Sequence, residues 1–322
     1  MKFKEVPMKI SMDRTIELLK SAEDVLILTH KNPDGDTLGC GVALCLVLQG
    51  MGKRARVVNG DVIPKRYDYL FEGIDMPGFE PKFVVAVDVA DNKLLGDMLN
   101  ADYGDKVDLC IDHHGTNVDY AKETYVVPED GAASLTLYRM FRAMGVEITP
   151  AIATALYTGI STDTGCFRYS NASSECYRAG ADLIDLGADN ANINVLMFET
   201  KPREYFELLS SVLSSMRVFC DGKVIVFKVT NEMFEKTGAT PDQCDAIAAM
   251  SRQFEGALCG ITMKEKQSGG FKFSLRTHEP LDAAALCSNF GGGGHKRAAG
   301  CDAEDEEKVL SDLIALIDKE LN

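Results

Sequence analysis

Short apolar runs alternate with longer helical patterns over the first half of the chain. The runs are rich in aliphatic and β-branched residues, as is typical of buried strands, and they fall at Val25–Thr29, Arg54–Asn59, Phe83–Val87, Val107–Ile111 and Tyr125–Val127. The helical patterns between or after them fall at Met12–Ala22, Thr37–Gln49, Ala132–Met144 and Pro150–Ser161. Strands that alternate with helices favour parallel pairing, so we expect an α/β fold with a mainly parallel sheet flanked by helices.

The pattern changes in the second half. The segment from Glu175 to Met216 is helical, without a convincing strand. Strand-like runs then return at Lys223–Thr230, Gly256–Met263 and Gly270–Arg276, with helical patterns at Pro241–Ser251, Leu281–Ser288 and Glu304–Leu321. The sequence therefore predicts an N-terminal domain over 1–187, a helical connector over 188–220 and a smaller C-terminal α/β domain over 221–322.

Histidines and aspartates gather where strands of the first domain end. They occur in LTHKNPDGDTLG, FVVAVDVAD and LCIDHHGTN, each of which begins in a strand, and in TGISTDTGCF, where a helix ends at a glycine turn. The set consists of His30, Asp34, Asp36, Asp88, Asp112, His113, His114 and Asp163. Ligands of open α/β sheets bind beyond the carboxyl ends of the strands, so we expect these side chains to share one crevice. Taken singly, Asp34 has an ordinary explanation as a helix N-cap, and Asp88 as a loop carboxylate.

The composition of this set indicates metal binding. Several carboxylates in one crevice repel each other unless cations lie between them. Imidazole nitrogens and carboxylate oxygens, without cysteine, suit a pair of divalent ions, Mn²⁺ first, with Mg²⁺, Co²⁺ or Fe²⁺ also compatible. Two ions about 3.5–4 Å apart activate water and stabilise the attacking and leaving oxygens of phosphoryl transfer. The residues thus predict a two-metal site for phosphoryl transfer.

The composition limits which partners the protein could bind and in which cellular compartment it is expected. The chain has 322 residues and a formal net charge of −15, which argues against binding of long nucleic acid but not against a short nucleotide held by a few cations. The N-terminus has no signal-peptide pattern, and no apolar stretch is long enough to span a bilayer. The ten cysteines form no C-x-x-C pair, so we expect reduced thiols in a cytoplasmic protein without membrane contact.

Four motifs in order carry a resemblance to a known family. HKNPDGDTLG, VDVAD, DHHGTN and STDTG resemble the motifs of the DHH phosphoesterases, while SLRT at 274–277 and FGGGGHKRAAG at 290–300 resemble the DHHA1 domain that accompanies them. Stand-alone members of this family hydrolyse very short RNAs and dephosphorylate 3′-phosphoadenosine 5′-phosphate (pAp). The resemblance implies a metal-dependent hydrolase of short oligoribonucleotides and pAp, with a two-metal-activated hydroxide as the nucleophile.

The resemblance also implies a ligand set. One ion would be held by His30, Asp34 and Asp88. The other would be held by Asp36, Asp88, His113 and Asp163. The resemblance further implies that Asp112 orients a ligand and that His114 faces the scissile phosphate, where it stabilises an oxygen or protonates the leaving group.

Two positions depart from the family pattern. Thr37 and Cys40 stand where the family usually has alanine or serine. Neither is a metal ligand in the family, so we expect little consequence from them.

The glycine-rich loop predicts an anion site in the second domain. Gly291–Gly294 can adopt positive φ and present successive N–H groups, and His295, Lys296 and Arg297 follow. Arg276 ends a strand and can clamp a phosphate. Seen alone, the loop is also explained as a linker and the arginine as a surface residue. Beside a phosphoesterase site, we expect Gly292, Gly293, His295 and Arg276 to bind substrate.

Other functions remain open at this stage. The same site could serve a phosphodiesterase for cyclic di-AMP or linear pApA, and the sequence does not separate these substrates. A small domain that closes over the crevice favours chain ends, which predicts exonucleolytic attack. A non-catalytic nucleotide sensor would need a degraded ligand set, and the six predicted ligands are intact. The sequence also leaves a homodimer open.

Overall fold

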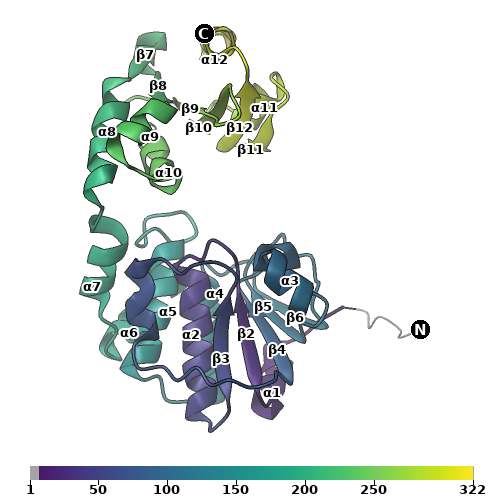
Figure 1. The fold of residues 1–322 in the computed structure, drawn as a ribbon. Helices are drawn as coiled ribbons and strands as arrows, with labels where there is room; N and C mark the ends of the chain where they lie inside the picture. The colour runs from purple at the N-terminus through teal and green to yellow at the C-terminus, as the bar shows by residue number, and fades with distance from the viewer. Residues whose placement is uncertain (1–6, 252, 322) are drawn as a thin grey trace. The chain divides into compact units, whose positions relative to one another are not determined.

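The protein is described by a computed structural model that covers residues 7–251 and 253–321. The chain divides into two compact units, the first ending at Thr200 and the second beginning at Lys201 (Figure 1). In the described residues, no helix has the length and apolar character that a bilayer crossing requires.

The first unit is built on a six-stranded sheet in which every pairing is parallel. The strands are β1 (Met8–Lys9), β2 (Val25–Thr29), β3 (Ala55–Asn59), β4 (Phe83–Val87), β5 (Leu109–Asp112) and β6 (Glu123–Val126). Their spatial order is β1-β6-β5-β4-β2-β3, so the chain runs outward on both sides of the β2–β4 pair. The order in which strands are added thus reverses between β2 and β4, and open α/β sheets bind ligands at such a point.

Helices cover both faces of this sheet (Figure 1). One face carries α1 (Met12–Ser21), α2 (Gly35–Gly50), α4 (Ala133–Met144), α5 (Pro150–Asp163) and α6 (Ser174–Asp185). The other carries the short helices η2 (Asn92–Leu95) and α3 (Asp97–Tyr103). Nearly all of α2 is buried, because it packs between the sheet and α5, and its sequence is accordingly apolar on all sides.

The predicted helical stretch is confirmed. After α6 come α7 (Asn190–Asn194), the π-helical turn η3 (Val195–Glu199) and α8 (Arg203–Ser214). The 3₁₀ segment η1 (Lys65–Phe71), between β3 and β4, was not expected from the pattern.

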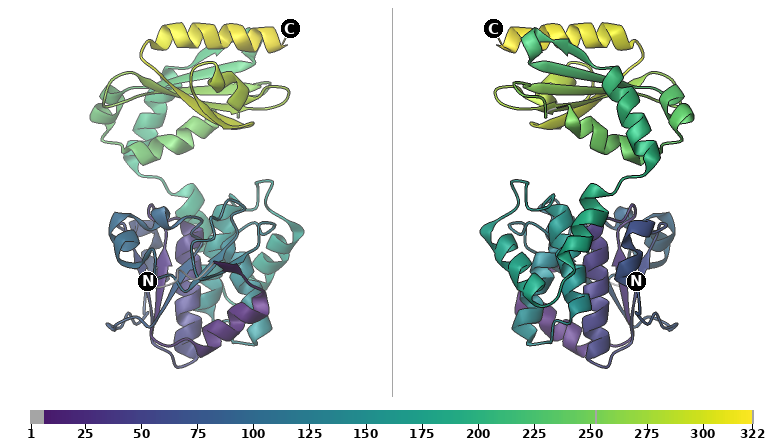
Figure 2. Two further views of the ribbon diagram at one scale, coloured as in Figure 1. Left: turned by 90° about the vertical axis from the view of Figure 1, so that its right-hand side faces the viewer. Right: turned by 90° about the vertical axis from the view of Figure 1, so that its left-hand side faces the viewer.

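The second unit has a mixed sheet of order β11-β12-β10-β9-β8-β7. Its strands are β7 (Arg217–Phe219), β8 (Val224–Val229), β9 (Cys259–Glu265), β10 (Phe271–Thr277), β11 (Gly293–His295) and β12 (Ala298–Ala303). Only β8 and β9 pair in parallel. One face packs on α11 (Ala283–Ser288) and α12 (Glu306–Leu321), and the other packs on α8, α9 (Asn231–Thr237) and α10 (Pro241–Met250), as Figure 2 shows for α12.

The predicted fold class is confirmed: a parallel α/β domain, a helical middle and a smaller α/β domain. The pattern missed β1, β7, α3, α9 and the β11–β12 hairpin. The expected strand Gly256–Met263 begins three residues late, at Cys259, because Gly256 lies in a turn with a positive φ of 81°.

Candidate metal centre

Three neighbouring parallel strands deliver the predicted side chains to one edge of the first sheet. His30 follows β2, Asp88 follows β4, and Asp112 ends β5, with His113 and His114 directly after it. The β2–β4 and β4–β5 pairs are adjacent in the sheet, and the order in which strands are added reverses between β2 and β4. These side chains therefore lie at the topological switch point, where the sequence predicts a crevice.

Helix N-termini hold two of the aspartates. Asp34 is the N-cap of α2, and its Oδ1 accepts hydrogen bonds from the N–H groups of Asp36 (3.0 Å) and Thr37 (3.1 Å). The buried carboxylate of Asp36 accepts from Ala133 N–H (2.6 Å) and Ser134 N–H (2.9 Å) at the start of α4. The positive end of a helix stabilises a carboxylate, so these contacts hold both side chains in place.

Asp88 occupies the centre of the site in an unfavourable environment. Its backbone adopts a positive φ of 56°, which is uncommon outside glycine, and its side chain is 3% exposed. Its Oδ1 has no hydrogen-bond partner among the described residues. Burial, together with the nearby Asp36, Asp34 and Asp112 carboxylates, raises the pKa of Asp88 well above its ordinary value. A buried carboxylate with an unpartnered oxygen fits a metal ligand.

Backbone carbonyls set the orientation of two histidines. Nδ1 of His30 lies 2.8 Å from Lys31 O, and Nδ1 of His113 lies 3.0 Å from Asp130 O. A carbonyl oxygen only accepts, so each Nδ1 carries the donated proton and Nε2 faces the aspartates. Metal-binding histidines are typically oriented in this way.

Three groups of donors could each hold an ion. They are His30, Asp34 and Asp88; Asp36, His113 and Asp163; and Asp88, His113 and His114. Within each group the donor atoms lie within 4.8 Å of one another. The first group reproduces one predicted ligand set, and the second reproduces the other without Asp88.

The distances between donor atoms in these groups leave space for an ion. His30 Nε2 is 3.6 Å from Asp34 Oδ1 and 3.7 Å from Asp88 Oδ2. His113 Nε2 is 3.5 Å from Asp163 Oδ2, 3.6 Å from Asp88 Oδ1 and 3.9 Å from Asp36 Oδ2. These separations are longer than hydrogen bonds, yet two donors on one ion, each about 2.1 Å from it, are no more than about 4.2 Å apart. His113 thus joins Asp88 to the second group.

Asp163 adds negative charge where the backbone already supplies it. It is the last residue of α5, at the negative end of the helix dipole. Burial and the neighbouring Asp36 carboxylate raise the pKa of Asp163 to about 7. Bound cations would offset this repulsion, so the residues present fit a divalent metal site.

Asp112 differs from the other aspartates because its hydrogen bonds are complete. The buried carboxylate accepts from His113 N–H (2.8 Å), His114 Nδ1 (2.8 Å) and Asn117 Nδ2 (2.7 Å). Burial alone would raise its pKa, but these bonds outweigh burial and the pKa of Asp112 is lowered. Asp112 belongs to none of the three donor groups.

His114 remains accessible beside this network. Its side chain is 44% exposed, and its Nδ1 also lies 3.5 Å from Asp88 Oδ1. The hydrogen bond to Asp112 raises the pKa of His114. The structure therefore places a half-exposed His114 beside Asp88 and Asp112.

The second unit brings the glycine loop close to Arg276. Arg276 lies on β10 opposite Ala298 of β12, and β12 pairs with the loop strand β11. A pocket of about 440 Å³ lies beside the loop and is lined in part by Gly291, Gly292 and Gly293. Arg276 is partly exposed and His295 is exposed, so both are accessible to a ligand.

The prediction of a four-glycine anion nest is wrong. Only Gly291 (φ 70°) and Gly294 (φ 145°) have positive φ, and Gly293–His295 forms a strand. The N–H groups of Gly291 and Gly292 donate to Ser288 O (3.3 Å) and Cys287 O (3.0 Å), which removes them from a nest. Gly292 is required for another reason, since a Cβ there would collide with Gly300 O and Cys301.

Comparison with known proteins identifies the family. Residues 24–160 match the DHH family, N-terminal domain, and residues 221–322 match the DHHA1 domain. The bifunctional oligoribonuclease and PAP phosphatase NrnA of Thermus thermophilus is 31% identical over 299 residues, which cover 88% of this chain and 86% of the relative. The chain belongs to the DHH phosphoesterase family.

Two further proteins match over nearly the full chain. NrnA of Bacillus subtilis is 22% identical over 317 residues, covering 96% of this chain and 98% of the relative. Among solved structures, an exopolyphosphatase-related protein from Bacteroides fragilis has a TM-score of 0.83 at 23% identity, with 96% of this chain and 97% of that chain covered. This structural likeness supports the fold.

Glycines let the two helices that carry DHH-motif aspartates pack closely. On α2, a Cβ at Gly35 would collide with the Thr162 side chain of α5. On α5, a Cβ at Gly159 would collide with Ser134 Oγ and lie 2.5 Å from Asp36 Oδ1. The absence of a side chain at Gly159 thus leaves room for the Asp36 carboxylate.

Gly159→Ala is therefore expected to displace Asp36. Alanine normally stabilises a helix by about 1 kcal/mol relative to glycine, but overpacking here should reverse the sign and cost about 1–3 kcal/mol. Thermal unfolding and Mn²⁺ titration measure the two effects, and both the melting temperature and the affinity for Mn²⁺ should fall. Gly50→Ala is the matched control, because a Cβ there meets nothing within 4 Å. Equal behaviour of the two variants would contradict this account of Gly159.

Several supporting residues were not found from the sequence. Thr37 Oγ1 accepts from His30 N–H (3.2 Å) and donates to Val87 O (3.2 Å), so it ties together the ends of β2 and β4. The sequence had indicated little consequence at Thr37. Asn117, which holds Asp112, stands within the quoted DHHGTN motif, and that position was the available signal.

Proposed function

We propose that this protein is a metal-dependent phosphoesterase that hydrolyses short oligoribonucleotides from an end and dephosphorylates pAp. The observation that carries the proposal is the joining of the two donor groups through His113 and Asp88. The names of the Thermus thermophilus and Bacillus subtilis relatives support the choice of substrates.

Two divalent ions complete the proposed site, with Mn²⁺ first and Mg²⁺, Co²⁺ or Fe²⁺ as alternatives. One would be held by His30, Asp34 and Asp88. The other would be held by Asp36, Asp88, His113 and Asp163. Bound ions of this kind activate water and neutralise the charge that develops on a phosphoryl group.

The remaining residues bind the substrate and move a proton. Asp112 holds the proton on Nδ1 of His114, and a protonated His114 can donate from Nε2 to the leaving oxygen. Arg276 and His295 supply donors for a second phosphate or a ribose, beside Gly292 and Gly293. In this proposal residues 1–187 form the catalytic domain, 188–220 the connector and 221–322 the substrate-binding domain.

A hydrolysis panel tests the function. The purified chain is incubated with Mn²⁺ or EDTA and with pAp, pApA, cyclic di-AMP or RNAs of two to about twenty nucleotides. Fast release of product from pAp and the shortest RNAs, in Mn²⁺ only, is the expected result. Turnover confined to cyclic di-AMP and pApA would replace the proposal with a signalling phosphodiesterase. Binding of Mn²⁺ without turnover of any compound would indicate a nucleotide sensor.

Arg276→Ala should weaken substrate binding rather than chemistry. Loss of one charged hydrogen-bond donor to phosphate costs about 1.5–3 kcal/mol, so KM for pAp should rise by roughly ten- to a hundredfold with kcat little changed. Steady-state kinetics measure both constants. Arg203→Ala is the control, because Arg203 is exposed on α8 and pairs with Glu207. An unchanged KM would remove Arg276 from the proposed binding site.

Asp112→Asn should move the alkaline limb of the pH profile. A His114 that acts as the acid must be protonated, so kcat falls as the pH rises through its pKa. Asp112 raises that pKa, and the variant should therefore lose activity at a lower pH than the wild type. Profiles of kcat from about pH 5.5 to 9, with exposed Asp102→Asn as the control, measure the shift. An unmoved limb would contradict the role of His114 as acid.

A further inference from the structure

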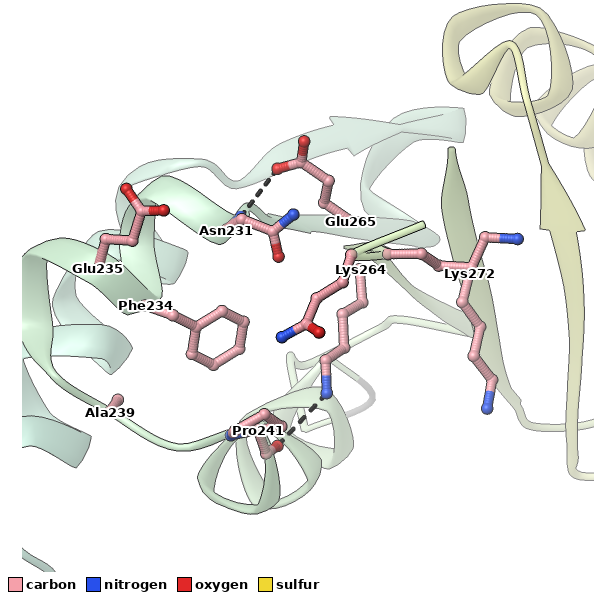
Figure 3. A pocket seen from close by; sticks show the side chains of 10 residues that line it. Asn231, Phe234, Glu235, Ala239, Pro241, Lys264, Glu265 and Lys272 are labelled. Atoms are coloured by element: carbon pink, nitrogen blue, oxygen red, sulfur yellow. Dashed lines mark hydrogen bonds between the residues drawn. The ribbon is translucent and has the colours of Figure 1, made fainter. Parts of the chain in front are cut away.

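The second unit holds a larger pocket apart from the glycine loop. Its volume is about 920 Å³, and its walls come from α9, the start of α10, the end of β9 and the first residues of β10. Figure 3 shows the Phe234 ring pointing into this pocket, with Lys264 extended from β9 toward Pro241. Asn231, Lys266, Gln267 and Lys272 also line it.

The sheet register places two lysines directly opposite each other at this pocket. Lys264 of β9 and Lys272 of β10 are paired across the antiparallel ladder. Like charges at such positions are destabilising. On its other side Lys272 faces Asp302 of β12, whose carboxylate is engaged by Lys266. Within the described part of the chain, neither lysine forms an ion pair with a carboxylate, whereas Lys266 pairs with Asp302 at 3.1 Å. The Lys264 ammonium donates to Pro241 O, at 3.4 Å. Two lysines at one pocket, both without a carboxylate partner among the described residues, favour an anionic ligand.

Phe234 adds an aromatic surface to these cations. The ring is partly exposed, and Lys264 Nζ lies 5.6 Å from its centroid. Nucleic-acid bases stack on such rings, and the side-chain amides of Asn231 and Gln267 can both donate and accept hydrogen bonds at a base edge. Of the two glutamates in the lining, Glu265 is engaged by Asn231 N–H at 2.8 Å, and Glu235 is exposed. An aromatic ring, amides and lysines together match a base with its phosphate.

Lys272 connects this pocket to the glycine loop, since it lines both. We propose that the pocket binds a nucleotide, with the base on Phe234 and the phosphate between Lys264 and Lys272. The nucleotide is either a unit of an oligonucleotide held at the glycine loop, which rests on the proposed function, or a free mononucleotide.

Binding is tested without hydrolysis. The full chain in EDTA is titrated with mant-AMP, whose fluorescent group is on the ribose and leaves the base free. Phe234→Leu, which keeps an apolar side chain but removes the ring, and Lys264→Gln should each weaken binding at least tenfold. Phe234→Tyr should restore it. The matched controls are Phe206→Leu and Lys308→Gln, exposed residues on α8 and α12 that do not line the pocket. Arg276→Ala should leave this binding in place.

The outcomes separate the alternatives. Wild-type affinity in Phe234→Leu and Lys264→Gln, with melting temperatures unchanged, would overturn the proposal. If affinity falls, KM is measured in Mn²⁺ for a five-nucleotide RNA and for pAp. A higher KM for the RNA alone identifies the occupant as a unit of the substrate, and unchanged KM values identify a free nucleotide. A chain that hydrolyses neither compound would contradict the proposed function, while the titration in EDTA would still decide the nucleotide site.

Discussion

Replacing Asp88 with asparagine is expected to reduce turnover of pAp by roughly a thousandfold, which corresponds to about 4 kcal/mol of transition-state stabilisation. Asp88 lies 3.7 Å from Nε2 of His30 and 3.6 Å from Nε2 of His113, the histidines of the two predicted ligand sets. Loss of its charge should weaken both donor groups together. Steady-state kinetics and Mn²⁺ titration measure the two effects. Asparagine is preferred to alanine because it tolerates the positive φ of 56° at this position.

The same variant should be more stable than the wild type when no metal is present. Asp88 is buried with an unpartnered oxygen, and its raised pKa means that ionisation destabilises the folded state. A neutral amide removes this penalty, so the free energy of unfolding in EDTA at pH 7.5 should be higher than that of the wild type by about 1–3 kcal/mol.

Asp112→Asn provides the matched control for stability. Its carboxylate accepts three hydrogen bonds and its pKa is lowered, so the same substitution should destabilise the protein there. Retention of more than a few per cent of activity in Asp88→Asn, or equal stability changes in the two variants, would contradict the role given to Asp88.

Local pattern predicted the strands that build the site. Val25–Thr29 and Phe83–Val87 are continuous apolar runs, as expected for parallel strands buried on both faces, and their bounds were predicted correctly. Parallel strands end at the same edge of a sheet, so the sequence alone was enough to place the motif after each run beside its neighbours.

Contacts between distant segments could not be predicted in the same way. Asp36 accepts from the start of α4 almost a hundred residues later, and Gly159 makes room for it through the packing of α5 on α2. These relations depend on packing rather than on periodicity. The hairpin of β11 and β12 was missed because its strands consist mostly of glycine and alanine and contain no β-branched residue, so the signal of a strand is absent.

Divalent metal should stabilise the first unit, and by more as the pH rises. Two sites at a hundred times their Kd each add about 2.7 kcal/mol, which corresponds to a rise in Tm of the order of 10 °C. Thermal unfolding in Mn²⁺ and in EDTA, repeated from pH 5 to pH 8, measures the difference.

The sign of the pH dependence follows from the carboxylates. The pKa of Asp163 is raised from 3.8 to about 7. Between these two pH values the carboxyl group is therefore protonated in the metal-free folded state and ionised in the unfolded state. Metal-free stability from this group is full below about pH 4 and is lost as the pH rises to about 7, by roughly 4 kcal/mol at most. The raised pKa of Asp88 acts in the same direction, whereas the lowered pKa values of Asp34 and Asp112 matter only below about pH 4.

Metal binding requires these carboxylates to be ionised, so its stabilisation increases over the pH range in which the metal-free protein weakens. The gap between the two melting temperatures should therefore widen from pH 5 to pH 8. Asp88→Asn should lose at least half of the gap at pH 8, because it removes charge from the group shared by both predicted ligand sets. A gap that is constant with pH, or one that persists in Asp88→Asn, would mean that Mn²⁺ stabilises the chain at a different place.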